Sequence, residues 1–426
     1  MSEKKIPAIR FKGFMDDWVQ HKLRDVFVSL QNNTLSRAEL NDSHGAALDI
    51  HYGDVLIKFP ECLNVKYEQI PFIQETSIVD KYKSSLLQNG DIILADTAED
   101  DTVGRCTEIN GITKEKVLSG LHTIPYRPQI SFATGFLGFY MNSVAYRKQL
   151  LPLMQGIKVT SLSKNSMQGT DIKFPKDLHE QADIGQSFLR LDNLIAIHQR
   201  KLTKFQLLKK SMLTKMFPKD GARVPEIRFQ GFHGDWEQHK IGSLTNVLSA
   251  SRVHKEEWTK DGVPFFRSSD VISAFKGKEN EKAFISFKLY AQLIKSSGKL
   301  EKNDILITGG GSIGIPYIVP DNKPLYSKDA DLIWIKCSNK FDSKFLYTYF
   351  ISEQFRDYLN CISHTGTISH YTIEQVKETP IYLPSIMEQK KIGEIFKNLC
   401  FIIGIYHSKL SKLQQIKQAM LSKLFV

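Results

Sequence analysis

Apolar residues recur at alternating steps of four and three in two long segments of the chain. The first seam runs through Ile184, Phe188, Leu191, Ile195, His198, Leu202, Phe205, Lys209, Met212 and Met216, and the second through Ile392, Phe396, Leu399, Ile403, Tyr406, Leu410, Leu413, Lys417, Met420 and Leu424. This spacing is the heptad pattern of helices that pair through one apolar stripe. A lysine interrupts both seams at the same register, and we expect the apolar neighbours Leu208 and Ile416 to cover the seam there.

The two helices are predicted to pair with each other as a coiled coil. A single amphipathic helix would more simply pack on its own domain. Two matched helices of about 35 residues are longer than ordinary globular helices, however, and their seams need partners of equal length. Residues 218–221 (Pro-Lys-Asp-Gly) stop the first helix. If a pseudo-twofold axis relates the halves of the chain, the helices run antiparallel, and a rod of about 50 Å separates the two domains like a ruler.

The chain is an internal duplication. Residues 6–23 (IPAIRFKGFMDDWVQHKL) recur as residues 224–241 (VPEIRFQGFHGDWEQHKI). A turn followed by an apolar run recurs at residues 89–94 and 302–307, and predicts a buried strand in each half. Between such anchors, residues 30–87 show no evident counterpart in residues 248–299. Shared frames with diverged interiors indicate two domains of one fold that recognise different things.

These patterns predict an α+β fold with a pseudo-twofold internal repeat, in which each recognition domain is mixed α/β around a twisted sheet. We expect the first recognition domain at residues 1–178, a central spacer helix at 179–222, the second recognition domain at 223–386 and a C-terminal spacer helix at 387–426. A chain of 426 residues, 42% of them hydrophobic, is long enough for domains that each bury a core.

Composition favours a polyanionic partner without identifying it, because Lys and Arg outnumber Asp and Glu by 57 to 46. The five cysteines are scattered without a Cys-x-x-Cys pair, so neither a zinc site nor a disulfide framework is indicated. The N-terminus lacks the apolar core of a signal peptide, and the longest apolar run, residues 399–406, is too short to span a bilayer. We therefore expect a cytoplasmic protein.

Catalytic and cofactor motifs are weak. Residues 309–314 (GGGSIG) satisfy Gly-x-Gly-x-x-Gly, but the extended, proline-broken segment 315–320 follows instead of a helix, so a tight turn with close backbone approach is the better interpretation. No Pro-Pro occurs, which excludes the motif of an adenine methyltransferase, and no Walker loop is present. A nuclease site built from residues 320–321 and 388–390 needs too long a spacing. We predict no catalytic, cofactor or metal site in this chain.

The repeated opening segments combine an arginine with aromatic residues, ending at Trp18 and Trp236. They could stack nucleotides, but their faithful repetition better fits packing of each domain onto the helical rod, or contact with a shared partner subunit. Glu180-Gln181 and Glu388-Gln389 are interpreted likewise as helix-start residues, with contact to a partner as the alternative.

Candidate DNA contacts are polar and basic residues in the variable interiors. Arg and Lys suit guanine edges and phosphates, and Ser, Thr and His suit either. The candidates are Arg105, Lys158, Thr160, Ser161, Ser163 and Lys164 in the first half, and Arg267, Ser268, Ser269, His364, Thr365, Thr367, Ser369 and His370 in the second. The partner-facing or coiled-coil candidates are Ile184, Phe188, Leu191, Leu202, Phe205, Ile392, Phe396, Leu399, Tyr406, Leu410, Leu413, Trp18 and Trp236.

Taken in order, these motifs resemble the specificity subunits of type I restriction-modification enzymes. The resemblance rests on the Pro-x-Ile-Arg-Phe-x-Gly-Phe-x-x-x-Trp opening of each half, the Asp-Ile-Ile-Leu or Asp-Ile-Leu-Ile strand, the Pro ahead of Glu-Gln, and the heptad helices. Residues 48–55 and 265–270 also look like segments found early in that family's target recognition domains. The resemblance covers nearly the whole chain.

The resemblance implies that each domain reads one half of a split duplex DNA target through the major groove, with the helices fixing the gap. It implies a non-catalytic chain that docks two methyltransferase subunits, which use S-adenosylmethionine to methylate adenine, and optionally two motor-nuclease subunits that use ATP and Mg²⁺. The acidic residues 99–101 stand where the second half has its glycine-rich loop, which puts DNA contact by that first-half loop in doubt. A two-headed coiled-coil adaptor that binds peptide or RNA is the alternative.

Overall fold

The computed structural model describes residues 6–156, 158–219, 221–327, 331–363 and 370–426. The chain forms two compact units. Unit 1 comprises Met1–His198 and Lys409–Val426, and unit 2 comprises Gln199–Ser408. Each unit therefore contains one recognition domain together with part of each long helix. Within the described residues, no helix has the length and apolar character needed to cross a bilayer.

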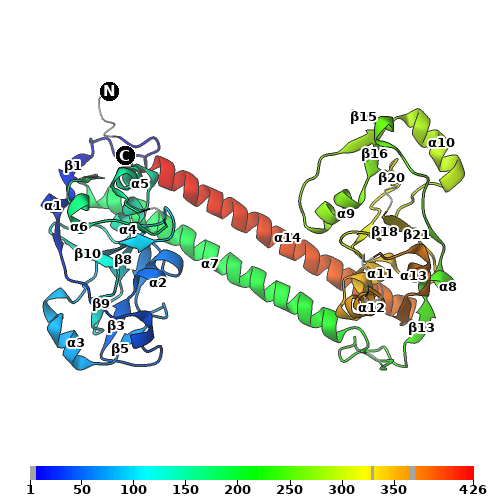
Figure 1. The fold of residues 1–426 in the computed structure, drawn as a ribbon, viewed down its shortest axis with the longest axis horizontal. Helices are drawn as coiled ribbons and strands as arrows, with labels where there is room; N and C mark the ends of the chain where they lie inside the picture. Colours follow the sequence, from blue (N-terminus) through cyan, green and yellow to red (C-terminus); the bar gives the residue numbers. More distant parts are fainter. Residues whose placement is uncertain (1–5, 157, 220, 328–330, 364–369) are drawn as a thin grey trace. The chain divides into compact units, whose positions relative to one another are not determined.

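Unit 1 contains short strands and helices (Figure 1). They pack around three clusters of buried hydrophobic residues. Its strands are β1 (Val19–Lys22), β2 (Phe27–Ser29), β3 (Ala47–Ile50), β4 (Cys62–Asn64), β5 (Phe72–Ile73), β6 (Ile92–Ala95), β7 (Thr97–Ala98), β8 (Cys106–Asn110), β9 (Val117–Ser119), β10 (Thr123–Pro128), β11 (Thr160–Ser161) and β12 (Asp171–Phe174). Its short helices are α1 (Leu23–Val26), η1 (Arg37–Glu39), α2 (Tyr52–Ile57), α3 (Thr76–Lys81), η2 (Lys83–Ser85), α4 (Phe136–Met141), α5 (Val144–Leu150), η3 (Leu151–Leu153) and α6 (Lys164–Met167).

The main sheet of unit 1 has five strands in the order β2-β10-β6-β8-β4. Its pairs are antiparallel except that β4 runs parallel to β8. A second sheet has the order β5-β3-β9, and two-strand ribbons pair β1 with β12 and β7 with β11. The central strand β6 is an unbroken apolar run, and all four of its residues are buried, as a strand covered on both faces requires.

Unit 2 repeats the plan with different lengths. Its strands are β13 (Glu237–Lys240), β14 (Val247–Leu248), β15 (Trp258–Thr259), β16 (Val263–Phe266), β17 (Ala283–Ile285), β18 (Ile305–Thr308), β19 (Pro316–Ile318), β20 (Tyr326–Ser327), β21 (Leu332–Ile335) and β22 (Pro380–Leu383). Its helices are α8 (Ile241–Leu244), η4 (Lys255–Glu257), α9 (Ser268–Phe275), α10 (Phe287–Ser297), α11 (Ser343–Phe350), α12 (Glu353–Ser363) and α13 (Ile373–Glu378). The sheets have the orders β14-β21-β18-β19 and β15-β17-β16-β20, and β13 pairs with β22.

The interiors that share no evident sequence nevertheless share a topology. In each unit a strand leads directly into a helix, as β3 into α2 and β16 into α9. That strand pairs in parallel with one later strand (β9 or β20) and antiparallel with another (β5 or β17). The absence of a sequence counterpart therefore reflects divergence of side chains on a common frame, because strand pairing uses backbone groups that many sequences supply.

The two long helices are α7 (Leu178–Lys215) and α14 (Ile386–Lys423), each of 38 residues. In unit 1, Phe188 of α7 stacks on Phe425, just beyond α14, and Asp192 meets Lys417. In unit 2, Phe205 of α7 stacks on Tyr406 of α14. In unit 1 these contacts join rising residue numbers on α7 to falling residue numbers on α14. The predicted antiparallel pairing of the helices is confirmed.

The apolar neighbours of the two seam lysines do not cover the seam as predicted. Leu208 is 43% exposed and Ile416 is 49% exposed, so neither covers the seam, and that prediction was wrong. Lys417 itself lies in the seam, and its ammonium is 2.8 Å from both Asp192 and Glu61, the residue before β4. A charged side chain is tolerated here because two carboxylates offset the loss of its hydration.

The repeated opening segments lock onto the starts of the long helices. Arg10 donates two hydrogen bonds to the buried carboxylate of Glu180, at 2.7 and 2.8 Å, and Arg228 does the same to Glu388, at 2.8 Å for both bonds. Trp18 is buried in the core of unit 1 and Trp236 in that of unit 2. In each half, the opening segment and the start of the long helix are thus far apart in the sequence but in contact in the fold. This contact attaches the domain to its helix.

Candidate nucleic-acid interface

Three loops of unit 1 converge where β6 ends. The N–H of Asp96 bonds to the carbonyl of His122, and the carbonyl of Asp96 accepts the N–H of Leu162. The ribbon of β7 and β11 pairs Thr160 with Ala98. The segment 158–164, in which several DNA candidates lie, is therefore held beside the loop that follows β6. We call the loop after β6 (from Asp96), the turn at His122 and segment 158–164 the unit 1 loop cluster.

His122 is the most distinctive exposed side chain of the unit 1 loop cluster. Its backbone has φ of 55°, a left-handed conformation that non-glycine residues rarely adopt. Its ring lies edge-on to Tyr52, with centroids 5.3 Å apart, and Nδ1 is 3.2 Å from a carboxylate oxygen of Asp96. Nothing in the sequence singles out this histidine, because its partners lie some 26 and 70 positions away.

The sequence candidates of unit 1 differ in how free their side chains are. Lys158 is exposed and Thr160 is half-buried. The Arg105 guanidinium donates to the carbonyls of Leu56 and Phe59 at the end of α2, so it holds that helix end. Ser163 caps α6. The Lys164 ammonium is 3.2 Å from the carbonyl of Leu30, and burial lowers the pKa of Lys164.

Unit 2 builds the same cluster around its glycine-rich loop. Gly309 donates its N–H to the Asp331 carbonyl and accepts the N–H of Tyr371. A Cβ at Gly310 would lie 2.3 Å from the Asp331 side chain, and one at Gly314 would lie 2.4 Å from Leu359. The loop is thus a tight turn with close approach, as predicted. We call this loop, Asp331 and His370 the unit 2 loop cluster.

The other unit 2 candidates lie at two places. His370 is exposed, and its ring is 3.9 Å from Asp331. Arg267 pairs with Asp270 at 2.8 Å and stacks over Trp258, so its guanidinium already has several contacts at the start of α9. The buried Ser268 hydroxyl has no partner among the described residues, and Ser269 accepts from Asn280. His364, Thr365, Thr367 and Ser369 lie outside the described residues.

A pair of equivalent arginines, which the sequence interpretation missed, anchors the loop after the central strand in each unit. Arg147 donates to the carbonyls of Asp101 and Val103. Arg356 donates to the carbonyls of Ile313 and Gly314. Both arginines stand four residues after a serine, Ser143 or Ser352, that begins the same helix of the repeat. Aligning the repeat through this Ser-x-x-x-Arg spacing is the signal that could have found them.

A buried carboxyl supports the turn that carries His122. Asp49 is fully buried, accepts a hydrogen bond of 2.8 Å from Asn33, and its second oxygen has no partner among the described residues. Asn33 in turn binds the Ser119 carbonyl at 3.0 Å. Burial raises the pKa of Asp49 to about 7, although the Asn33 hydrogen bond opposes this shift. The folded state is therefore most stable when the Asp49 carboxyl is protonated.

Unit 1 should accordingly lose stability as the pH rises from about 4 to about 7, because the folded state holds the Asp49 proton more tightly than the unfolded chain does. Asp49→Asn removes this dependence. The difference in unfolding free energy between variant and wild type is expected to grow toward higher pH by at most about 4 kcal/mol, since the shift is about three units. Urea unfolding at several pH values measures it. Asp42→Asn, at an exposed carboxylate, should leave the profile unchanged, and parallel profiles for Asp49→Asn would contradict the assignment.

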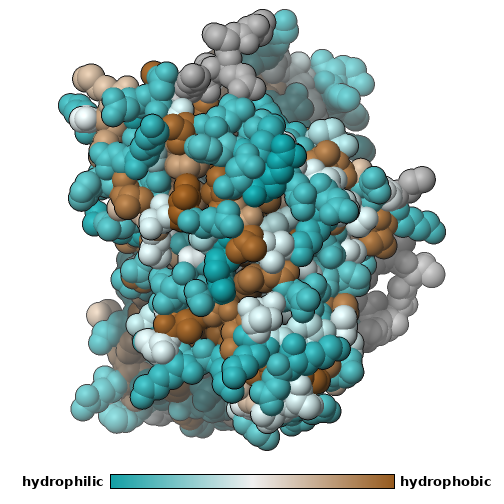
Figure 2. Space-filling view, turned by 90° about the vertical axis from the view of Figure 1, so that its left-hand side faces the viewer, coloured by the Kyte–Doolittle hydropathy of each residue, from teal (hydrophilic) through white to brown (hydrophobic). Residues whose placement is uncertain are grey.

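The face of the molecule at the left of Figure 1 is mostly hydrophilic, and hydrophobic residues form small separate patches on it (Figure 2). Such a face does not have the character of an extended apolar interface. Among the described residues, no group of His, Cys, Asp and Glu side chains is arranged to hold a metal ion.

Comparison with known proteins finds similarity to one family. A family model described as the type I restriction modification DNA specificity domain matches residues 233–415. The MjaVIII specificity subunit of Methanocaldococcus jannaschii is 25% identical over 279 residues, which cover 63% of this chain and 64% of that relative. The putative MjaX specificity subunit of the same organism is 20% identical over 96% of this chain and 93% of the relative.

A solved structure has the same fold. The type I restriction-modification S subunit from M. genitalium superposes with a TM-score of 0.58 at 13% identity, covering 99% of both chains. The family model, the curated relatives and this structural neighbour agree. The chain is therefore similar to the specificity subunits of type I restriction-modification enzymes in sequence, and to one of their solved structures in fold.

Proposed function

We propose that this chain is a non-catalytic specificity subunit that binds duplex DNA at a target of two separated parts, with one loop cluster reading each part through the major groove. In this proposal residues 1–178 and 223–386 are the recognition domains, and the helices at 179–222 and 387–426 set the gap between the two parts. Lys158, Thr160 and His122 are the candidate contacts in unit 1, and His370 with the glycine-rich loop in unit 2.

The observation that carries the proposal is that one frame presents two different loop clusters. The arginine anchor and the backbone bonds to the loop after the central strand are the same in both units. The loops themselves differ, since residues 99–101 are acidic in unit 1 while unit 2 has Gly309–Gly314. In unit 1, Asp100 turns back to bind Thr102. Different side chains on one scaffold favour an asymmetric target.

We further propose that the subunit directs adenine methylation by two methyltransferase subunits that carry S-adenosylmethionine, and restriction where motor-nuclease subunits with ATP and Mg²⁺ join them. This part of the proposal is supported only by the similarity to type I specificity subunits. The packing of Trp18 and Trp236 inside the units leaves the exposed faces of α7 and α14 for such subunits.

Selection of DNA from a random duplex library by the full chain with its methyltransferase partner should return two short sequences at a fixed separation. Affinity should fall by about 1000-fold between 50 and 200 mM salt if several phosphates are contacted. Mapping of methylated adenines in the host genome should give the same two-part site, which should vanish when the gene is deleted. Binding that selects no sequence, or that prefers RNA or peptide, would favour the adaptor alternative.

A further inference from the structure

In the described part of the chain, the main sheet of unit 1 has one edge strand, β4, that the corresponding sheet of unit 2 lacks. The main sheet of unit 1 ends with β4 paired to β8, whereas the corresponding sheet of unit 2 ends at β19. In unit 1 the segment between α2 and β5 spans residues 58–71 and includes β4. The corresponding segment of unit 2, between α9 and β17, spans only residues 276–282. The shorter segment is fully described and contains no strand. Unit 2 therefore lacks the piece of chain that covers the sheet edge in unit 1.

In unit 1 that piece lies between the sheet, α4 and the helix pair. The Glu61 carbonyl accepts the N–H of Glu108 on β8 at 2.9 Å, and its carboxylate binds Lys417 at 2.8 Å. It approaches α4 so closely that a Cβ at Gly138 would be 1.9 Å from the Glu61 oxygen. The glycine is thus required for the extended segment that carries Glu61 to fit there.

The repeat locates the same place in unit 2. Ile92 faces Glu108 across β6 and β8, and Ile305 faces Ile318 across β18 and β19, so Ile318 is the counterpart of Glu108. By the same alignment Tyr347 corresponds to Gly138 and Cys400 to Asp192. Ile318, Tyr347 and Cys400 all line one cavity of about 1150 Å³ between β19, α11 and α14. We call it the α11–α14 groove.

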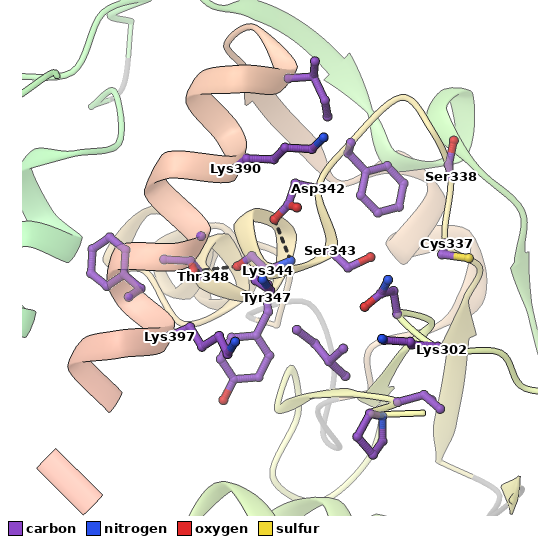
Figure 3. Close-up of a pocket in the computed structure, with 18 of the residues that line it drawn as sticks. Lys302, Cys337, Ser338, Asp342, Ser343, Lys344, Tyr347, Thr348, Lys390 and Lys397 are labelled. Atoms are coloured by element: carbon purple, nitrogen blue, oxygen red, sulfur yellow. Dashed lines mark hydrogen bonds between the residues drawn. The ribbon is translucent and has the colours of Figure 1, made fainter. Parts of the chain in front are cut away.

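The chemistry of the α11–α14 groove is apolar inside and basic around it. Phe341, Ile351 and Phe396 contribute apolar surface. Its charged lining residues are Lys302, Lys344, Lys390, Lys397 and Asp342, and Figure 3 shows these side chains around the cavity. Asp342 is occupied by the N–H groups at the start of α11.

The lysines exceed the carboxylates available to them. Lys344 and Lys397 share the carboxylate of Glu394, at 2.6 and 3.6 Å. Among the described residues, no carboxylate pairs with Lys302 or Lys390. The groove therefore carries excess positive charge next to a sheet edge. On that edge the N–H of Val319 donates to the carbonyl of Asp304, the residue before β18. The alternation of a strand therefore turns the N–H and C=O of Ile318 toward the groove.

We propose that the α11–α14 groove binds an extended acidic segment of a partner protein, which takes the place that residues 60–64 occupy in unit 1. Its carboxylates meet Lys302 and Lys390, its apolar side chains meet Phe341 and Phe396, and its backbone runs along β19. Peptides that add to a sheet edge gain main-chain hydrogen bonds in this way. The proposal does not depend on DNA recognition.

Tyr347 makes the unit 2 groove different in one respect. Because a side chain stands where unit 1 has Gly138, the partner segment cannot approach α11 as closely as Glu61 approaches α4. The aromatic ring instead offers the segment an apolar surface within the groove.

Fluorescence anisotropy on the full chain tests this with a labelled peptide in which glutamates alternate with leucine and valine. The peptide should bind, and Lys302→Glu with Lys390→Glu should weaken binding at least tenfold. Lys412→Glu, at an exposed lysine of α14 outside the groove, is the matched control and should not. A peptide with lysines in place of the glutamates should fail to bind.

Thiol labelling locates the site, because Cys337 and Cys400 line the groove while Cys361 is exposed elsewhere. The acidic peptide should protect Cys337 and Cys400 and leave Cys361 reactive. The proposal is overturned if the acidic and basic peptides bind alike, if the double lysine variant binds as well as the control, or if duplex DNA protects the two cysteines and displaces the peptide. The last outcome would make the groove a nucleic-acid surface.

Discussion

Replacing Lys417 with methionine is expected to lower the free energy of unfolding by about 3 kcal/mol. The ammonium lies 2.8 Å from Asp192 and from Glu61, and all three side chains are at most 22% exposed. Burial lowers the pKa of Lys417, but the two carboxylates outweigh this and raise it overall, so the lysine is charged. Without it, two carboxylates face each other in a largely dry site, and breaking such a buried group by removing one partner costs several kcal/mol.

Lys209 provides a matched control, because it occupies the same register of the repeat. Where the repeat places Asp192 opposite Lys417, it places Cys400 opposite Lys209. Among the described residues, Lys209 has no carboxylate partner. Lys209→Met should change stability by no more than about 0.5 kcal/mol. Adding Glu61→Gln and Asp192→Asn to Lys417→Met should restore most of the loss. Urea unfolding followed by circular dichroism, with hydrogen exchange across residues 409–423, measures these changes, and equal effects of the two lysine variants would contradict the role given to Lys417.

The long helices and the repeated frames could be predicted because their signals are local and periodic. A heptad is visible in any window of the sequence, and the Arg10–Glu180 and Arg228–Glu388 contacts join motifs that the repeat already marks. The Lys417 site could not be predicted in this way. Glu61 lies 356 positions from its lysine, in an interior with no matching sequence, so the local pattern left Leu208 and Ile416 as the only visible candidates.

The sequence predicted which loop segments carry polar and basic candidates, but not which contacts their side chains make. Segment 158–164 does lie against the loop after β6, yet Arg105 and Arg267 are engaged in intramolecular contacts. His122 and the anchoring Arg147 and Arg356 were missed. Composition distinguishes a basic loop from an apolar strand, but whether a guanidinium is free or caps a helix end depends on carbonyls brought near it by folding. Both outcomes use the same residue type.

Phe205→Glu combined with Leu410→Glu is expected to abolish recognition of the two-part target. Phe205 stacks on Tyr406 with ring centroids 5.6 Å apart, and Leu410 is 8% exposed. A carboxylate at either position must be buried without a cation or must separate the helices, and both are costly. If the helix pair sets the gap, its loss makes the two half-sites bind almost independently. Affinity for the complete target should then fall by about 100-fold or more.

Gap length gives the sharpest readout of this prediction. Wild-type protein should discriminate strongly between the selected target and one whose separation is changed by a few base pairs, because the helix pair is stiff. The double variant should bind both duplexes with nearly the same, lower affinity. Leu207→Glu with Ile416→Glu is the matched control, since these side chains are 63% and 49% exposed on the same two helices, and it should keep the wild-type preference. If the Phe205 and Leu410 variant also keeps that preference while circular dichroism shows the helices unpaired or shortened, the gap is set by something other than the coiled coil.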